Sequence, residues 1–222
     1  MWIILNVPKM KQSTMGTCGS ISLLMVMSYL GHIQSTSSLE FKIWRESALF
    51  PMRMSNVEGL AIISLKEGYN VIMFKESSKF IIPRLNKDFI NYESLGGRVD
   101  LERACYFTYS QQRETLKEYS RRWKEINRKI CIEDVKKLLK LGLPIIVLIN
   151  TKDLYNEDML HWVVVKGIDC MTKKIYINDP LDRVNEVNFD LFEKITKIDS
   201  KYSQAIVIFK NDIESIIKEL RS

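Results

Sequence analysis

Residues 10–31 read MKQSTMGTCGSISLLMVMSYLG and decide the fold. From Gly19 to Leu30 nearly every side chain is small or apolar, and a helix that is apolar on almost every face is buried rather than amphipathic. Gly31 is suited to end this helix, because glycine tolerates the left-handed conformation that closes helices. The stretch therefore predicts a loop that leads into a buried central helix beginning at Cys18.

Cys18 falls at the N-terminus of that helix, where unpaired N–H groups and the helix dipole stabilise an anion. A thiol in such a place ionises more readily than a free one. Gln12 lies upstream in the same loop, with an amide that could donate to a substrate oxyanion. Because free cysteines usually serve only to pack the core, a catalytic role for Cys18 depends on a base elsewhere in the chain.

Length and composition narrow the class of protein. The chain has 222 residues and is 46% hydrophobic, enough to bury a sizeable core, and we expect a single domain over residues 1–222. The net charge of +6 is spread over interleaved acidic and basic residues, which argues against a nucleic-acid partner. No apolar run approaches the ~18 residues of a membrane span, and the apolar N-terminus is too short for a signal peptide.

The cysteines are far apart in the sequence, with no close pair: Cys18, Cys105, Cys131 and Cys170. In a chain of this size such spacing predicts neither a disulfide framework nor a zinc site. We therefore expect a reducing, cytoplasmic compartment and no metal or organic cofactor.

Helices dominate the first half of the chain. Ser55 or Asn56 is suited to cap one of them, because their side-chain oxygens accept hydrogen bonds from the free N–H groups of a first turn. The expected elements are a strand at Trp2–Val7, helices at Ser37–Glu46 and Val57–Glu67, a strand at Tyr69–Lys75, a loop over Glu76–Leu101 with a short helix near Leu85–Tyr92, and a strand at Ala104–Tyr109.

Residues 111–129 are highly charged. Glu114 and Lys117, like other acidic and basic residues of this stretch, fall at a spacing that supports a helix. We expect a solvated helix over Gln111–Lys129, and a nucleic-acid or membrane-binding face is the alternative. An amphipathic helix at Ile132–Leu141 follows.

The last third predicts an antiparallel sheet. Pro144–Ile149 is a continuous apolar run, which is typical of a strand buried on both faces. Helices followed by an antiparallel sheet indicate an α+β fold. The other expected elements are strands at Leu160–Ile168, Lys174–Asn178 and Ala205–Phe209, a helix at Asp190–Ile195, and a closing helix capped by Asn211 that runs to Leu220.

The chain has two candidate bases, His32 and His161. His32 follows the far end of the central helix, roughly 18 Å from its start, so we discount it. His161 opens a strand beside a polar loop. If the hairpin that follows has a three-residue loop, His161 lies opposite Asp179 with Cβ atoms ~5 Å apart. A one-residue change of register would instead send the two side chains to opposite faces.

Together these residues suit the chemistry of a thiol hydrolase. Cys18 and His161 would form a thiolate–imidazolium pair, and the imidazolium would later protonate the leaving amine. Asp179 would hold the imidazole in one tautomer. The Gln12 amide and the backbone N–H of Cys18 would stabilise the tetrahedral oxyanion.

The chain resembles the papain-like cysteine peptidases of the bacteriocin-processing (peptidase family C39-like) superfamily in three stretches: VPKMKQSTMGTCGSISLLMVMSYLG at 7–31, HWVVVKGID at 161–169 and KKIYINDP at 173–180. The resemblance implies a papain-like fold, with an N-terminal helical half and a central nucleophile helix packed on a C-terminal antiparallel sheet. It also implies a peptide or protein substrate and roles for four residues: Gln12 as oxyanion donor, Cys18 as nucleophile, His161 as base and Asp179 as orienting acid.

One departure from that family concerns length. Cys18 and His161 are 143 positions apart (161 − 18), more than in the exporter peptidase domains of the family. We expect the excess in an insertion at about residues 76–130. The exporter domains cleave after a double-glycine leader, and no transporter segment accompanies this chain, so the resemblance does not carry that substrate over.

Three other functions stay open. The same four residues would serve a peptidyl or acyl transferase, in which an amine or thiol replaces water as acceptor. A catalytically silent papain-like scaffold could bind peptides without cleaving them, although such a scaffold need not keep all four residues. A basic interaction protein could use residues 111–129, which predicts salt-sensitive binding of nucleic acid.

Overall fold

A computed structural model describes residues 1–31, 36–76, 98–198 and 202–221. His32 and the short helix expected near Leu85–Tyr92 lie outside these residues. None of the described helices is long and apolar enough to span a membrane.

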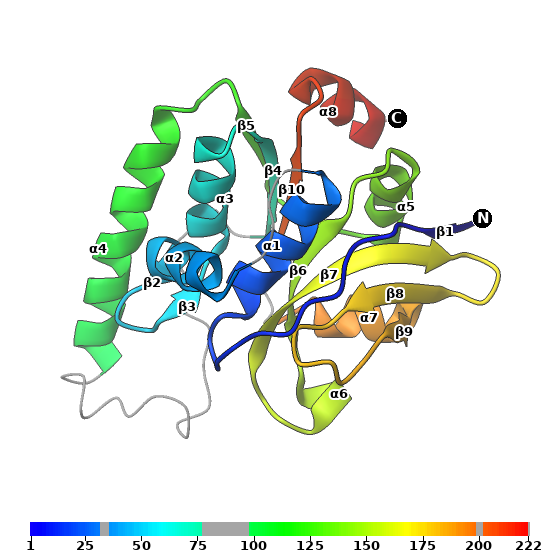
Figure 1. The fold of residues 1–222 in the computed structure, drawn as a ribbon, viewed down its shortest axis with the longest axis horizontal. Coiled ribbons are helices and arrows are strands. Elements are labelled where there is room, and N and C mark those ends of the chain that lie inside the picture. Colours follow the sequence, from blue (N-terminus) through cyan, green and yellow to red (C-terminus); the bar gives the residue numbers. More distant parts are fainter. Residues whose placement is uncertain (32–35, 77–97, 199–201, 222) are drawn as a thin grey trace.

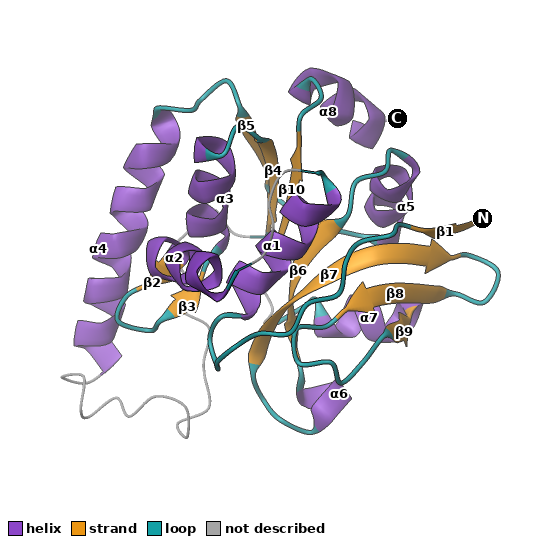
Figure 2. Cartoon of the chain, viewed as in Figure 1, coloured by secondary structure: helices purple, strands orange, loops and turns teal. Residues whose placement is uncertain are grey.

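The described residues form one large sheet in the strand order β5-β4-β10-β6-β7-β8-β9, with β1 paired alongside β7 (Figures 1 and 2). Neighbouring strands run antiparallel except β4 and β5, which are parallel. The bounds are β1 Trp2–Ile4, β4 Asn70–Lys75, β5 Trp123–Ile126, β6 Ile145–Asn150, β7 Leu160–Asp169, β8 Lys174–Asn178, β9 Glu186–Asn188 and β10 Gln204–Phe209.

Helices cover both faces of this sheet. Successive side chains of a strand point to opposite faces, and the central strand β6 divides accordingly. Ile146 and Leu148 pack with α1 and α3, whereas Ile145 and Val147 pack with α5, α7 and α8. The helices are α1 Cys18–Tyr29, α2 Ser37–Ser47, α3 Val57–Lys66, α4 Arg98–Lys117, α5 Ile132–Lys140, α6 Lys152–Tyr155, α7 Phe189–Ile195 and α8 Ile213–Arg221.

The predicted α+β, papain-like arrangement is confirmed, with a helical half packed on an antiparallel sheet. The central helix α1 begins at Cys18, as predicted, and its residues from Cys18 to Met27 are buried. It packs on β7, with α2 and α3 beside it (Figure 1). The sheet is wider than expected, because β4 and β5 from the first two thirds of the chain join it.

The start of α1 packs closely against neighbouring elements at Gly19. A Cβ atom at this position would come within 2.7 Å of the Ser55 Cβ and 3.1 Å of the Trp162 Cδ1. Ser55 belongs to β3 (Met54–Ser55), which pairs with β2 (Ala48–Leu49) in a small hairpin, and Trp162 belongs to β7. The Trp162 indole N–H donates to the Ser55 carbonyl at 2.9 Å. Gly19 therefore lets α1 touch the hairpin and the main sheet at once.

The two predicted caps have different outcomes. The Asn56 side chain accepts from the Gly59 N–H at 3.1 Å and caps α3, as predicted. The prediction that Asn211 caps the closing helix is wrong. The Asp212 side chain caps the helix in its place and accepts from the Ser215 N–H at 3.0 Å. The Asn211 backbone carbonyl accepts from the side chain of Asn70 on β4.

The structure contradicts two other predictions of secondary structure, both within residues 98–129. Ala104–Tyr109 is not a strand but part of α4, whose buried residues recur at helical spacing: Leu101, Cys105, Tyr109, Gln112 and Leu116. The helix predicted over Gln111–Lys129 is wrong beyond Lys117, because the chain turns and residues 123–126 add to β4 as the parallel strand β5.

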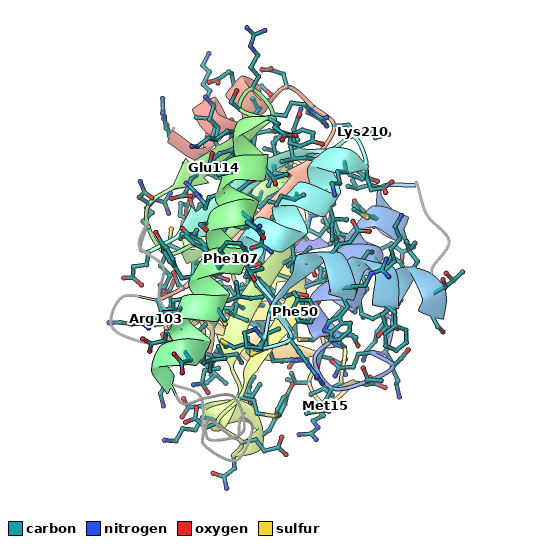
Figure 3. The ribbon with its side chains drawn as sticks, turned by 90° about the vertical axis from the view of Figure 1, so that its left-hand side faces the viewer. Met15, Phe50, Arg103, Phe107, Glu114 and Lys210 are labelled. Carbon is teal, nitrogen blue, oxygen red and sulfur yellow. The ribbon has the colours of Figure 1, made fainter. Side chains whose placement is uncertain are left out.

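The charged residues of this region do not all pair within one helix, as their spacing predicted. Glu114 and Lys117 form the expected pair on α4. Arg113 instead crosses to Glu125 on β5, and Arg128 and Lys129 pair with acids farther along the chain. Figure 3 shows α4 lying beside α3, with Phe107 turned outward. The insertion at about residues 76–130 and the single domain over 1–222 stay predictions.

Candidate active site

Cys18 is the first residue of α1 and is 7% exposed. Thr17, the residue before it, makes no side-chain cap, because its hydroxyl donates to the Thr14 carbonyl instead. Burial raises the pKa of the Cys18 thiol, but the hydrogen bond and positive charge of His161 oppose this, as do backbone hydrogen bonds from Trp162 and Gly19. The net result is a pKa below the ordinary thiol value, so the site favours a thiolate.

His161 is the second residue of β7 and is 3% exposed. Its Nε2 lies 2.7 Å from Asp179 Oδ1 and donates to it, since an ionised carboxylate can only accept. The other ring nitrogen, Nδ1, is left for Cys18. Burial lowers the pKa of His161, but the hydrogen bonds and charges of Asp179 and Cys18 raise it by more, to about 9.

Asp179 follows β8 directly and is fully buried. Its Oδ1 serves His161, while a hydroxyl and two backbone N–H groups surround Oδ2. Burial alone would raise the pKa of this carboxyl, but these donors lower it well below its usual range. Besides His161, the donors are Leu181 N at 2.8 Å to Oδ1, and Tyr155 OH at 2.7 Å, Arg183 N at 2.8 Å and Val184 N at 3.2 Å to Oδ2.

The predicted register of the β7–β8 hairpin is wrong, although its consequence holds. Asn178 lies opposite Val164, two residues from the partner predicted for it, because the turn is longer and a bulge interrupts β7 between Val165 and Gly167. A shift by two is even, so His161 and Asp179 keep to one face of the sheet. They meet diagonally rather than directly across the pair of strands.

Gln12 lies on the same cleft as Cys18 and His161. Its Nε2 donates to the Thr14 carbonyl at 3.0 Å, and its buried Oε1 has no hydrogen-bond partner among the described residues. An amide nitrogen carries two hydrogens, so one of them is left for a ligand in the cleft. The structure thus brings all four predicted residues to one site.

The cleft has a volume of about 190 Å³ and opens beside Cys18 and His161. Four separate segments form its walls: the loop that leads into α1, the β2–β3 hairpin, the chain that enters β7, and Leu181 in the loop after β8. Methionine side chains are flexible and adapt to apolar groups of varied shape. Four of them line the cleft, Met15, Met52, Met54 and Met159, together with the charged Arg53 and Asp158.

Two residues beside Asp179 were not predicted from the sequence as part of the site. Tyr155 ends α6 inside a stretch that reads only as a polar loop, and Arg183 holds its guanidinium 5.1 Å from the centre of the Tyr155 ring. Burial and the Asp179 charge raise the pKa of Tyr155, so its hydroxyl stays protonated and donates. No local pattern distinguishes these residues, because they meet Asp179 only in the folded chain.

Comparison with known proteins identifies the class. The model of the Peptidase_C39-like family matches residues 4–207, so the chain belongs to that family. It is therefore a C39-like cysteine peptidase, and the family and fold indicate hydrolysis of peptide bonds. The resemblance noted in the sequence is confirmed at the level of the family. No curated protein matches the chain.

One solved structure shares the fold at low sequence identity, and two others are similar to the chain with lower TM-scores. A putative C39-like peptidase from Bacillus anthracis has a TM-score of 0.54 and 17% identity, over 96% of this chain and 99% of that one. A double-glycine-motif protease of an AMS/PCAT transporter, solved with its leader peptide, has a TM-score of 0.48 and 14% identity, over 94% and 97%. The peptidase domain of Streptococcus ComA, a bifunctional transporter involved in quorum sensing, has a TM-score of 0.47 and 14% identity, over 93% and 100%.

Proposed function

We propose that the chain cleaves a peptide or amide bond of a peptide or protein substrate, with Cys18 as nucleophile and His161 as its base. Asp179 orients the imidazole, and Gln12 donates to the oxyanion. The observation that carries this proposal is the continuous chain of hydrogen bonds from Cys18 through His161 to Asp179, with Cys18 and His161 lining an open cleft. Three buried ionisable side chains in such a chain favour a thiolate–imidazolium pair.

Acylation is the first half of the proposed reaction. The Cys18 thiolate attacks the carbonyl carbon of the scissile bond, and the carbonyl oxygen becomes an oxyanion. The second Nε2 hydrogen of Gln12 and the backbone N–H of Cys18 donate to that oxyanion. The carbon–nitrogen bond then breaks, the amine takes the proton of the His161 imidazolium, and a thioester to Cys18 remains.

Deacylation completes the cycle. The neutral His161 takes a proton from water, the resulting hydroxide attacks the thioester carbonyl, and the same donors stabilise the second oxyanion. The carbon–sulfur bond breaks, which releases a carboxylic acid and restores the thiolate beside the imidazolium. An amine or thiol acceptor in place of water would give acyl transfer, so competition between acceptors distinguishes the two reactions.

Turnover by Cys18→Ala is the direct test. We expect this variant to melt as the wild type does and to lose cleavage of a library of quenched fluorescent peptides. Cys131→Ala is the matched control, because Cys131 lies at the start of α5, on the opposite side of the sheet from α1. This variant should cleave the peptides as the wild type does. Cleavage that persists in Cys18→Ala would refute the proposal, and binding without cleavage by the wild type would favour the silent scaffold.

We also propose a cytoplasmic location. All four cysteines are free in the structure, and the proposed nucleophile needs a reduced thiol. Recovery of the protein in a secreted fraction, with its cysteines oxidised, would contradict this location.

A further inference from the structure

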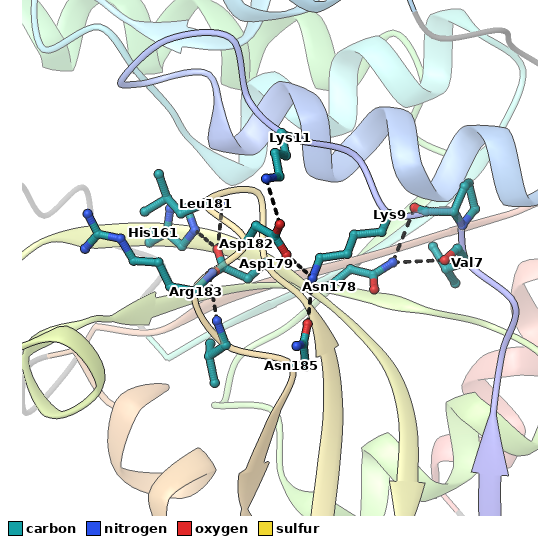
Figure 4. Close-up of polar contacts among 12 residues, drawn as sticks. Val7, Lys9, Lys11, His161, Asn178, Asp179, Leu181, Asp182, Arg183 and Asn185 are labelled. Atoms are coloured by element: carbon teal, nitrogen blue, oxygen red, sulfur yellow. Dashed lines mark hydrogen bonds and ion pairs between the residues drawn. The ribbon is translucent and has the colours of Figure 1, made fainter.

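The segment that carries Gln12 is fastened to the loop that carries Asp179 (Figure 4). Residues 7–12 run across the end of β8, and residues 178–185 face them. Gln12 and Asp179 come from parts of the chain that are far apart in sequence, so their relative position depends on these contacts.

Asn178 makes the buried part of this connection. It is the last residue of β8, is fully buried, and directly precedes Asp179. Its Nδ2 donates to the Val7 carbonyl at 2.9 Å and to the Pro8 carbonyl at 3.3 Å. One side-chain amide therefore fixes the start of the segment that ends at Gln12.

The other end of the segment is fixed by the backbone. The Gln12 N–H donates to the Pro180 carbonyl at 3.1 Å, next to Asp179. The stretch from Pro8 to Gln12 is thus held at both ends by residues 178–180. A short span fixed at both ends leaves the Gln12 side chain little freedom of position.

Exposed lysines reinforce the middle of the span. Lys9 and Lys11 both pair with Asp182, and Lys9 donates to Asn185 at 2.6 Å. These groups are a third or more exposed, and exposed ion pairs contribute little to stability. The buried amide of Asn178 is accordingly the side-chain contact on which the position of the segment depends.

We propose that Asn178 is a positioning residue that acts through Gln12. By holding Val7 and Pro8, it sets the Gln12 amide at the place where the oxyanion develops, while its chain neighbour Asp179 orients His161. One end of β8 thereby aligns both halves of the site, the oxyanion donor and the base. This inference rests on the proposed role of Gln12.

Two reactions of Cys18 distinguish this role from mere packing. Acylation by p-nitrophenyl acetate passes through a tetrahedral oxyanion: the thiolate attacks the acetyl carbonyl, p-nitrophenolate leaves, and a thioester forms. Alkylation by iodoacetamide is a displacement of iodide at a saturated carbon and forms no oxyanion. A residue that acts through Gln12 affects the first reaction and spares the second.

The experiment compares Asn178→Ala, Gln12→Ala and the double variant. We expect Gln12→Ala to slow acylation about 100-fold and Asn178→Ala to slow it about 10- to 100-fold, with alkylation unchanged in both. In the Gln12→Ala background, Asn178→Ala should cost less than about twofold more, because effects through one shared group are not additive. Lys174→Ala, at the other end of β8, is the control and should match the wild type.

Each other outcome overturns the inference. Additive losses, or acylation and alkylation slowed by the same factor, would assign Asn178 to packing or to Asp179. Unchanged acylation in Asn178→Ala would remove its role altogether. If Asn178→Ala fails to fold, Asn178→Leu keeps the side-chain volume and is judged by the same comparison. Full acylation in Gln12→Ala would instead refute the oxyanion role of Gln12 in the proposed function, a result that Asn178→Ala alone does not give.

Discussion

At the scale of single residues, the site is a set of buried charges that stabilise one another. Cys18, His161 and Asp179 are between 0% and 7% exposed, so each would lose its charge if it were alone. Burial opposes ionisation of all three, and hydrogen bonds along the row overcome it. Changing one member should therefore be visible in the titration of its neighbour.

Asp179→Asn tests that coupling. His161 has its pKa raised to about 9 by bonds that include the one to Asp179. Because the proposed acid is the imidazolium, acylation should fall as pH rises through that value. In Asp179→Asn the fall should move to lower pH, toward the ordinary histidine value of 6.5, as followed by the rate of peptide cleavage against pH, because the amine leaving group of a peptide needs the imidazolium proton.

Asp169→Asn is the matched control, because Asp169 ends β7, at the other end of the strand from His161, and its side chain accepts from Met171 and Thr172 of the turn. Its profile should overlay that of the wild type. An unmoved fall in Asp179→Asn would mean that Asp179 does not support the imidazolium.

Three of the four candidate residues could be chosen from sequence because each stands at a recognisable boundary. Cys18 opens an apolar helix, His161 opens a strand, and Asp179 precedes a proline that ends one. Tyr155 and Asn178 could not be chosen, since their partners are side-chain and carbonyl oxygens brought close only by the sheet. Local pattern therefore predicts the reacting groups better than the groups that support them.

At the scale of elements, strongly apolar segments were predictable, whereas the charged stretch of residues 111–129 was predicted only as far as Lys117. The strand β6 and the helix α1 are buried on nearly all sides, so their composition alone determines their place. The stretch of residues 123–126 is charged enough to suit a helix, yet β4 offers it an open edge, and it becomes a strand. Tertiary pairing overrides local preference there.

Gly19→Ala should weaken the packing of α1 against β3 and β7 and so lower the free energy of unfolding. The added Cβ would meet Ser55 and Trp162 at distances that require something to shift. Overpacking of this kind costs about 1–3 kcal/mol, which denaturant unfolding measures. Met25→Leu, a volume-conserving change within the same helix, should cost less than about 1.5 kcal/mol. Equal stabilities for Gly19→Ala and the wild type would show that the contact relaxes freely.

At the scale of the whole molecule, a buried polar cluster joins α4 to the rest. Lys75 of β4 pairs with Glu58 of α3, and the two side chains are 5% and 1% exposed. Asn56 donates to both Glu58 and Gln112, which lies on α4. The Lys75 ammonium also lies 5.3 Å from the ring centre of Tyr109, again on α4. This cluster links the helical half to the sheet.

Lys75→Met should be strongly destabilising, because it leaves the Glu58 carboxylate buried without an opposite charge. Breaking such a pair costs about 3–5 kcal/mol. Lys75→Met combined with Glu58→Gln should recover much of that loss, since a neutral amide replaces the orphaned charge. Denaturant unfolding of the three proteins is the measurement, and a double variant no more stable than the single one would contradict the account.

The most direct test of the central claim is the alkylation rate of each cysteine against pH, read by peptide mass spectrometry after iodoacetamide treatment. The account predicts fast labelling of Cys18 well below the ordinary thiol pKa of 9.0, and loss of that labelling in His161→Ala. Cys131 and Cys170 are internal controls. If Cys18 is labelled no faster than Cys131 and Cys170, or equally fast in His161→Ala, the ion-paired nucleophile is contradicted.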